Sequence, residues 1–547
     1  MKTRSNLVPA LWLCLFAGAV WGQEPRVAWL QQAGGPGAAV VMNMAIDGDD
    51  NLYITGGVGP GWVDFGDKRI LTGDSTEFLL AKADPQGHWL WAVHAPGTYT
   101  GWAKSVTVDT DGSAYVAGHF NGSMSWGDFT LSSTGGYDVF VVKANSAGQI
   151  QWAVRDGPDW PVGPTDRNYG TALAPHPNGG VLLAGVFEDQ ISLGGKSATV
   201  VDYSGMALFL TRLNPNGNAF WMSKAEGSVD WFAMGLATEQ SGNAFVAGGF
   251  WNLLRLGDVE LRRLENTEGP DIFVTKVDTN GTFVWAKQVK CQHAGRAFSV
   301  TADHAGNAFV TGTFYNSVTI DQVSLNTLGT NRDGLVIKFD PSGNLTWAKQ
   351  IGGQGTVNGV AIRTDLGGNA YVAGLFDGQA TFDQITLTSD GDADMFLAKM
   401  SPGGDFVWAK KGGGTKSDIA LGVEVDSRSD IFVAGHFESS LFVLESLSLT
   451  NHVVPDPRPN TSPKSVFLAK FASTPVRPAL SQVRLMLDGR FEFTVTVPDS
   501  RTYQIETSSN LSDWTVLTNV TANQSSISFR DDSAAAHDHR FYRAVSP

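Results

Sequence analysis

The sequence of 547 residues contains only two cysteines, Cys14 and Cys291, and Cys14 lies in the N-terminal apolar segment. If that segment is removed, Cys291 has no partner and no intrachain disulfide can form. Basic residues are also scarce: 39 Lys and Arg stand against 54 Asp and Glu, a formal net charge of −15. An acidic protein repels phosphate backbones, so we expect no nucleic-acid partner. The fold must be held by packing without covalent cross-links.

Long hydrophobic runs are absent after the first 22 residues. No later segment approaches the roughly 18 consecutive apolar residues that a bilayer requires, so we expect no membrane span. Lys2 and Arg4 precede an apolar stretch from Leu7 to Val20, and the small residue Gly22 precedes Gln23. This pattern predicts a cleaved signal peptide over residues 1–22. We therefore expect a secreted or extracytoplasmic protein in the periplasm, at the cell surface or outside the cell.

Helical spacing of apolar residues is also missing, and internal repeats take its place. Tryptophans recur at intervals of 61 to 69 residues, at Trp29, Trp91, Trp152, Trp221, Trp285, Trp347 and Trp408. Short segments that end in Ala-Gly or Thr-Gly begin at Tyr53, Tyr115, Leu182, Phe245, Phe309, Tyr371 and Phe432. A third set of apolar segments ends at Lys82, Lys143, Arg212, Lys276, Lys338, Lys399 and Lys470. Each of the three patterns predicts seven repeats.

One repeat can be divided into strands from its turns. Residues 105–109 alternate and lead through Asp111-Gly112, a hairpin signal, to residues 115–120. Residues 138–143 and the segment that carries Trp152 complete four antiparallel strands in one repeat. Four-stranded sheets repeated in this way are typical of β-propeller blades. We predict an all-β fold with a seven-bladed β-propeller over residues 23–473.

The two ends of the repeat region complement each other. The strand of Trp29 has no three strands before it, and the strands near Val423, Phe432 and Phe467 have no fourth strand before Pro475. The simplest arrangement adds the N-terminal strand to the last blade, which leaves no open sheet edge. The sequence therefore predicts that the first strand closes the ring.

Two resemblances accompany this pattern. The spacing Asp-x-x-Gly-x-x-x-Trp, as in Asp84 to Trp91, resembles the tryptophan-docking motif of quinoprotein dehydrogenase propellers. Those enzymes generally have eight blades and often a vicinal cysteine pair, which this chain lacks. From Trp29 to Phe471 the Trp-Ala-Lys, Tyr-Val-Ala-Gly and Phe-Leu-Ala-Lys pieces resemble the bacterial SBBP β-propeller repeat. That resemblance implies a propeller and no defined general activity.

A separate module is expected over residues 474–547. The tryptophan period stops at a Pro-containing linker, and six short strand-like segments follow, which predict a small β-sandwich. The segment 503–511, with Trp514 and residues 541–544, resembles C-terminal modules of large secreted bacterial proteins. The resemblance implies an accessory or surface-association role, and an inert stabilising cap is the alternative.

Functional residues should break the repeat, because features shared by every blade serve the scaffold. The Asp before the third strand, as in Asp138, Asp271, Asp333 and Asp394, and the Lys that ends it recur across the repeats in this way. At one position of the first strand, however, the repeats differ: Val40, Trp102, Tyr169, Phe232, Arg296, Asn358 and Ile419. We predict a ligand-binding arc at the channel mouth, made of Trp102, Tyr169, Phe232, Arg296, Asn358, Trp231, Trp251 and Trp160. Alternatively, these rings plug the channel mouth and pack on adjacent blades.

The sequence predicts no catalytic residue, metal or cofactor. Asp390, Asp392 and Asp394 lack the Gly and distal Glu of a calcium loop. His119 and His436 fall in different blades, and Cys291 is expected in a partly exposed loop. The favoured function is a monomeric, non-catalytic binding or scaffold protein that recognises carbohydrate or an extracellular protein. The alternative is a secreted polysaccharide hydrolase or lyase, which a carboxylate pair on the aromatic face would favour.

Overall fold

The computed structural model describes residues 24–157, 167–200, 205–263, 268–329, 331–451 and 464–472, and then 479–485, 491–496, 502–509, 513–521, 526–531 and 541–545. Every regular element in these ranges is a β-strand. None of the described segments forms a helix that is long and apolar enough to cross a bilayer. The chain divides into two compact parts: the large part comprises Val27–Asp426 and Ile431–Phe471, and the small part is chiefly Ala472–Pro547. The prediction of an all-β protein is confirmed.

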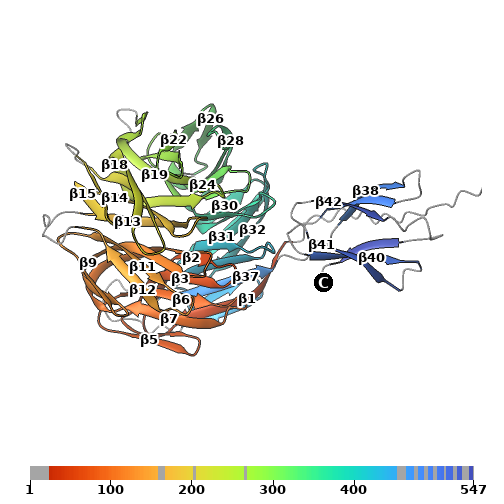
Figure 1. The fold of residues 1–547 in the computed structure, drawn as a ribbon, viewed down its shortest axis with the longest axis horizontal. Helices are drawn as coiled ribbons and strands as arrows, with labels where there is room; N and C mark the ends of the chain where they lie inside the picture. Colours follow the sequence, from red (N-terminus) through yellow and green to blue (C-terminus); the bar gives the residue numbers. More distant parts are fainter. Residues whose placement is uncertain are drawn as a thin grey trace, which may run out of the picture. The chain divides into compact units, whose positions relative to one another are not determined.

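The large part is built from four-stranded antiparallel groups, here called repeat sheets (Figure 1). The first three are β2 (Ala39–Ile46), β3 (Leu52–Val58), β6 (Glu77–Ala83) and β7 (Trp89–Ala95); β8 (Gly97–Val108), β9 (Ala114–Trp126), β11 (Asp138–Ala144) and β12 (Ile150–Arg155); and β13 (Tyr169–Pro175), β14 (Val181–Phe187), β17 (Ala207–Leu213) and β18 (Ala219–Thr238). The long strand β18 also begins the next group.

The remaining repeat sheets follow the same order. They are β18, β19 (Ala244–Leu256), β21 (Asp271–Val277) and β22 (Phe283–Cys291); β23 (Gly295–Ala302), β24 (Ala308–Tyr315), β27 (Arg332–Phe339) and β28 (Leu345–Gly353); β29 (Val357–Thr364), β30 (Ala370–Phe382), β31 (Ile385–Met400) and β32 (Phe406–Gly413); and β33 (Asp418–Val425), β34 (Ile431–Phe437), β37 (Ser465–Ala472) and β1 (Arg26–Gly34). The first strand of the chain therefore lies beside β37, as the last member of the last group.

Short strands lie between the second and third strands of the repeat sheets. They are β4 (Gly61–Phe65) and β5 (Lys68–Thr72), β10 (Phe129–Ser132), β15 (Gln190–Leu193) and β16 (Lys196–Thr199), β20 (Val259–Arg262), β25 (Ser317–Ile320) and β26 (Val323–Asn326), and β35 (Leu441–Leu444) and β36 (Leu447–Thr450). Several of them extend the outer strand of the preceding sheet: β4 pairs with β1, β25 with β22 and β35 with β32. Neighbouring sheets are thus joined by backbone hydrogen bonds as well as by packing.

The innermost strands of the repeat sheets surround a common centre. In chain order they are β2, β8, β13, β18, β23, β29 and β33; each contacts the next, and β33 contacts β2. Hydrophobic side chains fill the space between successive sheets, for example Tyr53 and Phe78 of one sheet against Val116 and Phe140 of the next. The large part thus has a propeller-like fold.

Six of the seven repeated tryptophans link their own sheet to the following one. Their indole nitrogens donate to backbone carbonyls at 2.9 to 3.1 Å: Trp29 to Pro85, Trp91 to Ser146, Trp152 to Pro215, Trp221 to Thr279, Trp285 to Pro341 and Trp347 to Pro402. Each acceptor lies in the turn between the third and fourth strands of the next sheet. In the first of these turns the Asp84 carboxylate accepts hydrogen bonds from the backbone NH groups of Gln86 and His88. The Asp84 side chain thus caps the turn that receives Trp29.

The recurring charged residues form a second repeated cluster. Lys82 Nζ lies 4.7 Å from the Tyr53 ring centroid and 3.1 Å from a carboxylate oxygen of Asp47. The same trio recurs as Lys143, Tyr115 and Asp109; Lys276, Phe245 and Glu239; Lys338, Phe309 and Asp303; and Lys470, Phe432 and Asp426. These side chains neutralise each other inside the fold and stabilise it.

The small part contains two three-stranded antiparallel sheets. One has the order β38 (Ala479–Leu485), β39 (Phe491–Thr496) and β42 (Ser526–Asp531); the other has the order β41 (Thr515–Thr521), β40 (Thr502–Ser508) and β43 (Phe541–Val545). Ile505 of the second sheet is fully buried. The hydroxyl of Tyr542 in β43 donates to the Asp531 carboxylate of β42 at 2.7 Å, which links the two sheets.

Candidate functional site

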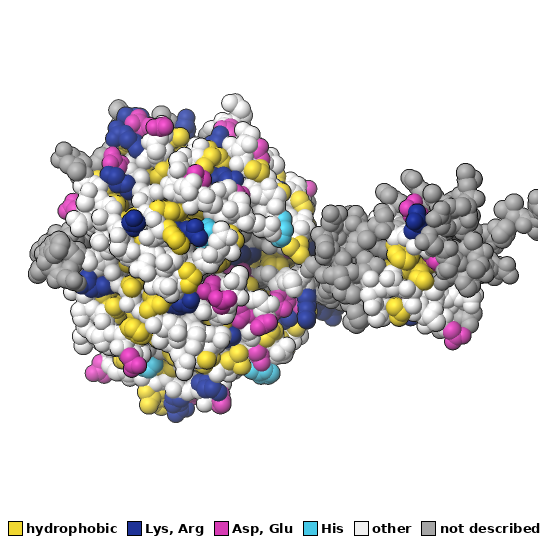
Figure 2. All heavy atoms as spheres, in the orientation of Figure 1, with side chains coloured by type: hydrophobic (Ala, Val, Ile, Leu, Met, Phe, Trp, Pro, Cys, Tyr) yellow, Lys and Arg dark blue, Asp and Glu magenta, His cyan; other side chains and the backbone are white. Residues whose placement is uncertain are grey.

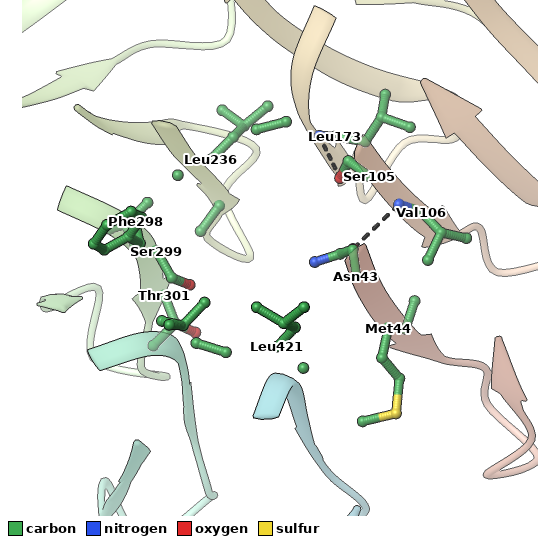
Figure 3. Close-up of a pocket in the computed structure, with 18 of the residues that line it drawn as sticks. Asn43, Met44, Ser105, Val106, Leu173, Leu236, Phe298, Ser299, Thr301 and Leu421 are labelled. Atoms are coloured by element: carbon green, nitrogen blue, oxygen red, sulfur yellow. Dashed lines mark hydrogen bonds between the residues drawn. The ribbon is translucent and has the colours of Figure 1, made fainter. Parts of the chain in front are cut away.

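A cavity of about 580 Å³ lies at the centre of the large part. Its wall is formed by side chains from the innermost strands, including Asn43, Ser105, Leu236 and Leu421 (Figure 3). Two of the polar wall groups hold neighbouring strands together. The Asn43 side-chain oxygen accepts from the Val106 NH at 3.1 Å, and the Ser105 hydroxyl accepts from the Leu173 NH at 3.0 Å. These two polar groups of the wall thus already have hydrogen-bond partners within the fold.

Aromatic side chains gather where the innermost strands begin. The rings of Tyr169 and Trp231 stack with centroids 5.1 Å apart, and Trp231 meets Phe232 edge-on at 5.9 Å. On the other side of Tyr169, the His119 ring packs edge-on at 4.6 Å. Tyr137 contacts both Tyr169 and His119. We call Tyr137, Tyr169, Trp231, Phe232 and Trp102 the aromatic cluster.

Basic side chains join this cluster. Lys104 Nζ lies 5.8 Å from the Trp102 ring centroid and 5.7 Å from that of Phe232, so one cation connects the two rings. The Arg296 guanidinium lies 5.7 Å from the Phe232 centroid and pairs with Asp230 at 2.7 Å. Asp230 also accepts the Phe232 NH at 3.1 Å, which fixes the backbone at the exposed ring.

The exposed faces of the cluster are available to a ligand. Trp102, Trp231 and Phe232 are 45%, 40% and 55% exposed, whereas Tyr169 is buried and supports Trp231 from below. Figure 2 shows hydrophobic and charged side chains around a hollow on one face of the molecule. An exposed, cation-flanked aromatic surface of this kind can bind a ring with an apolar face.

The structure brings together most of the predicted site residues. Trp102, Tyr169, Phe232, Arg296 and Trp231 are linked by ring and cation contacts. Phe232 and Asn358 both line the central cavity. Trp251 is partly exposed in β19, opposite Ser228 of β18, and no described ring contact joins it to the cluster. The predicted residue Trp160 lies outside the described residues.

Sequence reasoning missed three members of the site. Lys104 and Arg332 line the cavity, and Tyr137 extends the stacked rings. The signal for Lys104 was present, because it occupies the position two residues after the aligned site position. The other repeats place Met42, Thr171, Met234, Phe298, Val360 and Leu421 there, and all of these residues line the cavity.

Burial shapes the titration of this region. It lowers the pKa of Lys104 below its usual value. Burial and the neighbouring Lys104 charge lower the pKa of His119 to about 3, so its imidazole is neutral at physiological pH. Two carboxylates near the cluster are held in ion pairs, Asp230 with Arg296 at 2.7 Å and Glu188 with Arg167 at 2.8 Å.

The expectation for Cys291 was wrong. Cys291 ends strand β22 and is only 4% exposed, because its backbone pairs with Val318 of β25. Burial raises the pKa of its thiol, so it stays protonated and is a poor nucleophile. No group of three or more His, Cys, Asp or Glu side chains suited to a metal ion occurs within the described ranges. Asp394 instead accepts the Asp390 NH at 2.8 Å, within its own repeat sheet.

Comparisons with known proteins give distant similarities. No protein-family profile matches the sequence. An uncharacterised WD repeat-containing protein of Acanthamoeba polyphaga mimivirus is 24% identical over 459 residues, which cover 74% of this chain and 29% of that protein. The chain thus spans less than a third of the length of this relative. The similarity is consistent with a repeated propeller scaffold.

Solved structures show weaker likeness. A puromycin hydrolase variant matches 85% of this chain and 59% of its own, with 13% identity and a TM-score of 0.41. The dipeptidyl peptidase 4 of Porphyromonas gingivalis has the same coverage, 9% identity and a TM-score of 0.31. A glycoside hydrolase family 32 protein of Bifidobacterium adolescentis covers 83% of this chain and 80% of its own, with 11% identity and a TM-score of 0.23. Scores at this level do not establish a common activity.

Proposed function

We propose that this chain is a secreted, non-catalytic binding protein that recognises a glycan at the mouth of its central channel. The observation that carries the proposal is the aromatic cluster, whose exposed rings lie beside the cations Lys104 and Arg296. Flat apolar ring faces next to hydrogen-bond donors match the alternating apolar faces and hydroxyl edges of sugars. An extracellular protein that inserts an apolar side chain is the other ligand this surface would accept.

The proposed scaffold is a closed seven-bladed propeller followed by a small sandwich. Two features support the ring: β33 contacts β2, and Trp29 of β1 hydrogen-bonds the turn of the first repeat sheet, as five other repeated tryptophans do with their next sheets. Support for the sandwich comes from the two three-stranded sheets and the bond between Tyr542 and Asp531. A closed ring exposes no sheet edge, so we expect a monomer.

Binding is favoured over polysaccharide hydrolysis or cleavage by elimination. A glycosidase requires two carboxyl groups flanking the sugar, one of them protonated or free to act as a base. Two carboxylates near the cluster, Asp230 and Glu188, are each paired with an arginine. Carboxylates held in ion pairs are not free to flank a sugar as the acid and base that the reaction requires.

The binding proposal is tested with a glycan array and two single variants, Trp231→Ala and Phe232→Ala. We expect the wild type to bind a defined set of glycans, and each variant to lose about tenfold or more in affinity, since a stacked ring contributes on the order of 1 kcal/mol beyond its buried area. Trp62→Ala is the matched control, because Trp62 is also exposed but lies on the β4–β5 hairpin. Equal binding by the wild type and all three variants would show that the aromatic cluster does not bind the glycan.

Secretion rests on the pattern of the first 22 residues and needs its own test. Expression in a bacterial host with the native N-terminus should release a protein that begins at Gln23. N-terminal sequencing of the exported and cell-retained fractions measures this directly. An intact protein that starts at Met1 and stays in the cytoplasm would contradict the proposed location.

A further inference from the structure

One position in the innermost strands carries a charge in a single repeat. Six repeats place an uncharged residue there, and all six side chains line the cavity; the seventh places Lys104. A cation facing a mostly apolar cavity is unfavourable unless something compensates for its charge. Because a lysine at this position does not help the scaffold, its presence in one repeat indicates a role in function.

Lys104 has no counter-charge in the described part of the molecule. Its ammonium lies near the Trp102 and Phe232 rings, and no carboxylate or hydrogen-bond acceptor among the described residues pairs with it. The recurring lysines of the repeat sheets contrast with it, because Lys82 and Lys276 each reach a carboxylate at 3.1 Å. Burial also lowers the pKa of Lys104, so its charged form lacks the stabilisation that an anion would supply.

Two other polar groups on the cavity wall also lack an ion-pair or hydrogen-bond partner among the described residues. Arg332 stacks over the Tyr315 ring at 5.2 Å and forms no ion pair with any described residue. The side-chain oxygen of Asn358 is buried and has no hydrogen-bond donor within the described ranges. A buried polar atom without a partner costs about 1–3 kcal/mol, so it is commonly satisfied by water or a ligand.

The charged residues on the cavity wall indicate the charge of the ligand. Lys104, Arg332 and Arg363 are the basic residues that line the cavity, and Glu424 is the acidic one. Glu424 pairs with Arg363 at 2.8 Å, which leaves Lys104 and Arg332 without a carboxylate on the wall. The whole chain carries a formal charge of −15, so this excess of positive charge is a local reversal. Local positive potential in an acidic protein selects anions.

We propose that the channel mouth binds an acidic saccharide, with Lys104 and Arg332 as cationic contacts for its carboxylates and a cluster ring against a sugar face. The inference rests on the proposed glycan binding and specifies its ligand class. A uronic acid carries a carboxylate at the edge of a ring, so one sugar unit satisfies both an aromatic face and an adjacent cation. An acidic peptide side chain supplies the charge without the ring. The cavity volume is within the usual range of small-ligand sites.

The experiment is isothermal titration calorimetry of the full chain with trigalacturonic acid and with its methyl ester, which has the same rings without the charge. We expect the acid to bind at least about tenfold more tightly than the ester, with a preference that weakens as salt rises. Lys104→Gln and Arg332→Gln should each reduce that preference about tenfold. Lys196→Gln removes an exposed lysine on the β15–β16 hairpin and should change nothing. Lys104→Met, which keeps the aliphatic stem, should behave as Lys104→Gln and checks that lost packing is not the cause.

The outcomes separate the two proposals. Equal affinity for acid and ester, or an acid preference that survives both charge substitutions, overturns the acidic-saccharide inference. If Trp231→Ala still abolishes binding of neutral glycans, the proposed function stands without it. Binding of hexaglutamate in place of trigalacturonic acid overturns the saccharide assignment and shows an acidic-peptide site. Failure of every sugar, charged or neutral, contradicts both proposals.

Discussion

Replacing Trp29 by alanine tests the closure of the ring most directly. The indole NH of Trp29 donates to the Pro85 carbonyl at 3.1 Å, and its ring lies 6.2 Å from that of Phe432. A Cβ atom on Gly87 would lie 3.0 Å from the Trp29 ring, which shows how closely this turn packs on it. The contacts with Pro85 and Gly87 join β1, in the last repeat sheet, to the first repeat sheet, and Phe432 packs on Trp29 from β34 of the same sheet as β1.

The expected loss can be estimated from these contacts. Truncating a fully buried tryptophan typically costs about 3–5 kcal/mol, and Trp29 is only partly buried. We therefore expect Trp29→Ala to lower the free energy of unfolding by about 3 kcal/mol. Trp91→Ala is the internal comparison, because Trp91 makes the equivalent bond to Ser146 at 3.0 Å. Both substitutions should cost about the same if β1 is a true fourth strand.

The assay is guanidinium denaturation followed by far-UV circular dichroism, with the unfolding rate measured in parallel. Trp62→Ala serves as the control and should cost under about 1 kcal/mol, since Trp62 is exposed and its ring contacts the Arg69 guanidinium. The reasoning is refuted if Trp29→Ala behaves like Trp62→Ala while Trp91→Ala loses several kcal/mol. In that case β1 would not contribute to the stability of the closed ring.

Three further predictions follow from single residues. Gly281→Ala should cost about 2 kcal/mol or more in a thermal melt, because Gly281 has φ +87° and a Cβ there would lie 2.7 Å from the Trp221 ring. Cys291 should react with a thiol reagent only as fast as the chain unfolds; rapid labelling of the native protein would show that its burial is wrong. His119 and His436 have a folded pKa of about 3, so between pH 6.5 and 3 the unfolded chain binds protons that the folded chain does not. Stability should therefore fall with decreasing pH by up to about 1.4 kcal/mol per unit for each histidine, and a His119→Phe, His436→Phe double variant should show a flatter profile than the wild type.

The repeats could be predicted from the sequence because most of them carry a turn-capping polar residue and a packing Trp at a fixed spacing. The carboxylate of a turn Asp such as Asp84 accepts hydrogen bonds from two backbone NH groups. The turn shaped in this way then accepts the indole NH of a tryptophan from the preceding sheet, as Pro85 does from Trp29. Strand positions can then be counted from these markers. Counting in this way predicted that Trp102, Tyr169, Phe232 and Arg296 lie on one arc, and the structure joins them through ring and cation contacts.

The counting failed where an element departs from the repeat. Trp231 stacks on Tyr169 in the cluster, but no described ring contact joins the equally suggestive Trp251 of β19 to it. Cys291 was placed in a loop because its strand was expected to end earlier. Strand β22 continues to Cys291 because the β25 hairpin of the next sheet extends it through Lys290 and Cys291. Such pairing between sheets has no local signal in the sequence.

The candidate site and the repeated ion pairs lie at opposite ends of the innermost strands. Asp47, the acidic member of the trio with Lys82 and Tyr53, directly follows the innermost strand β2. The aligned site residue lies seven positions before it, about 23 Å along an extended chain. Substitutions at the start of the strand therefore leave the stabilising ion pair intact. That separation explains why one repeat can carry Trp102 and Lys104 while its neighbours carry Tyr169 and Thr171 without loss of the common fold. The innermost strands thus share the same stabilising residues at one end and carry different side chains at the other. Different side chains around the channel mouth allow the site to recognise a ligand that is itself asymmetric.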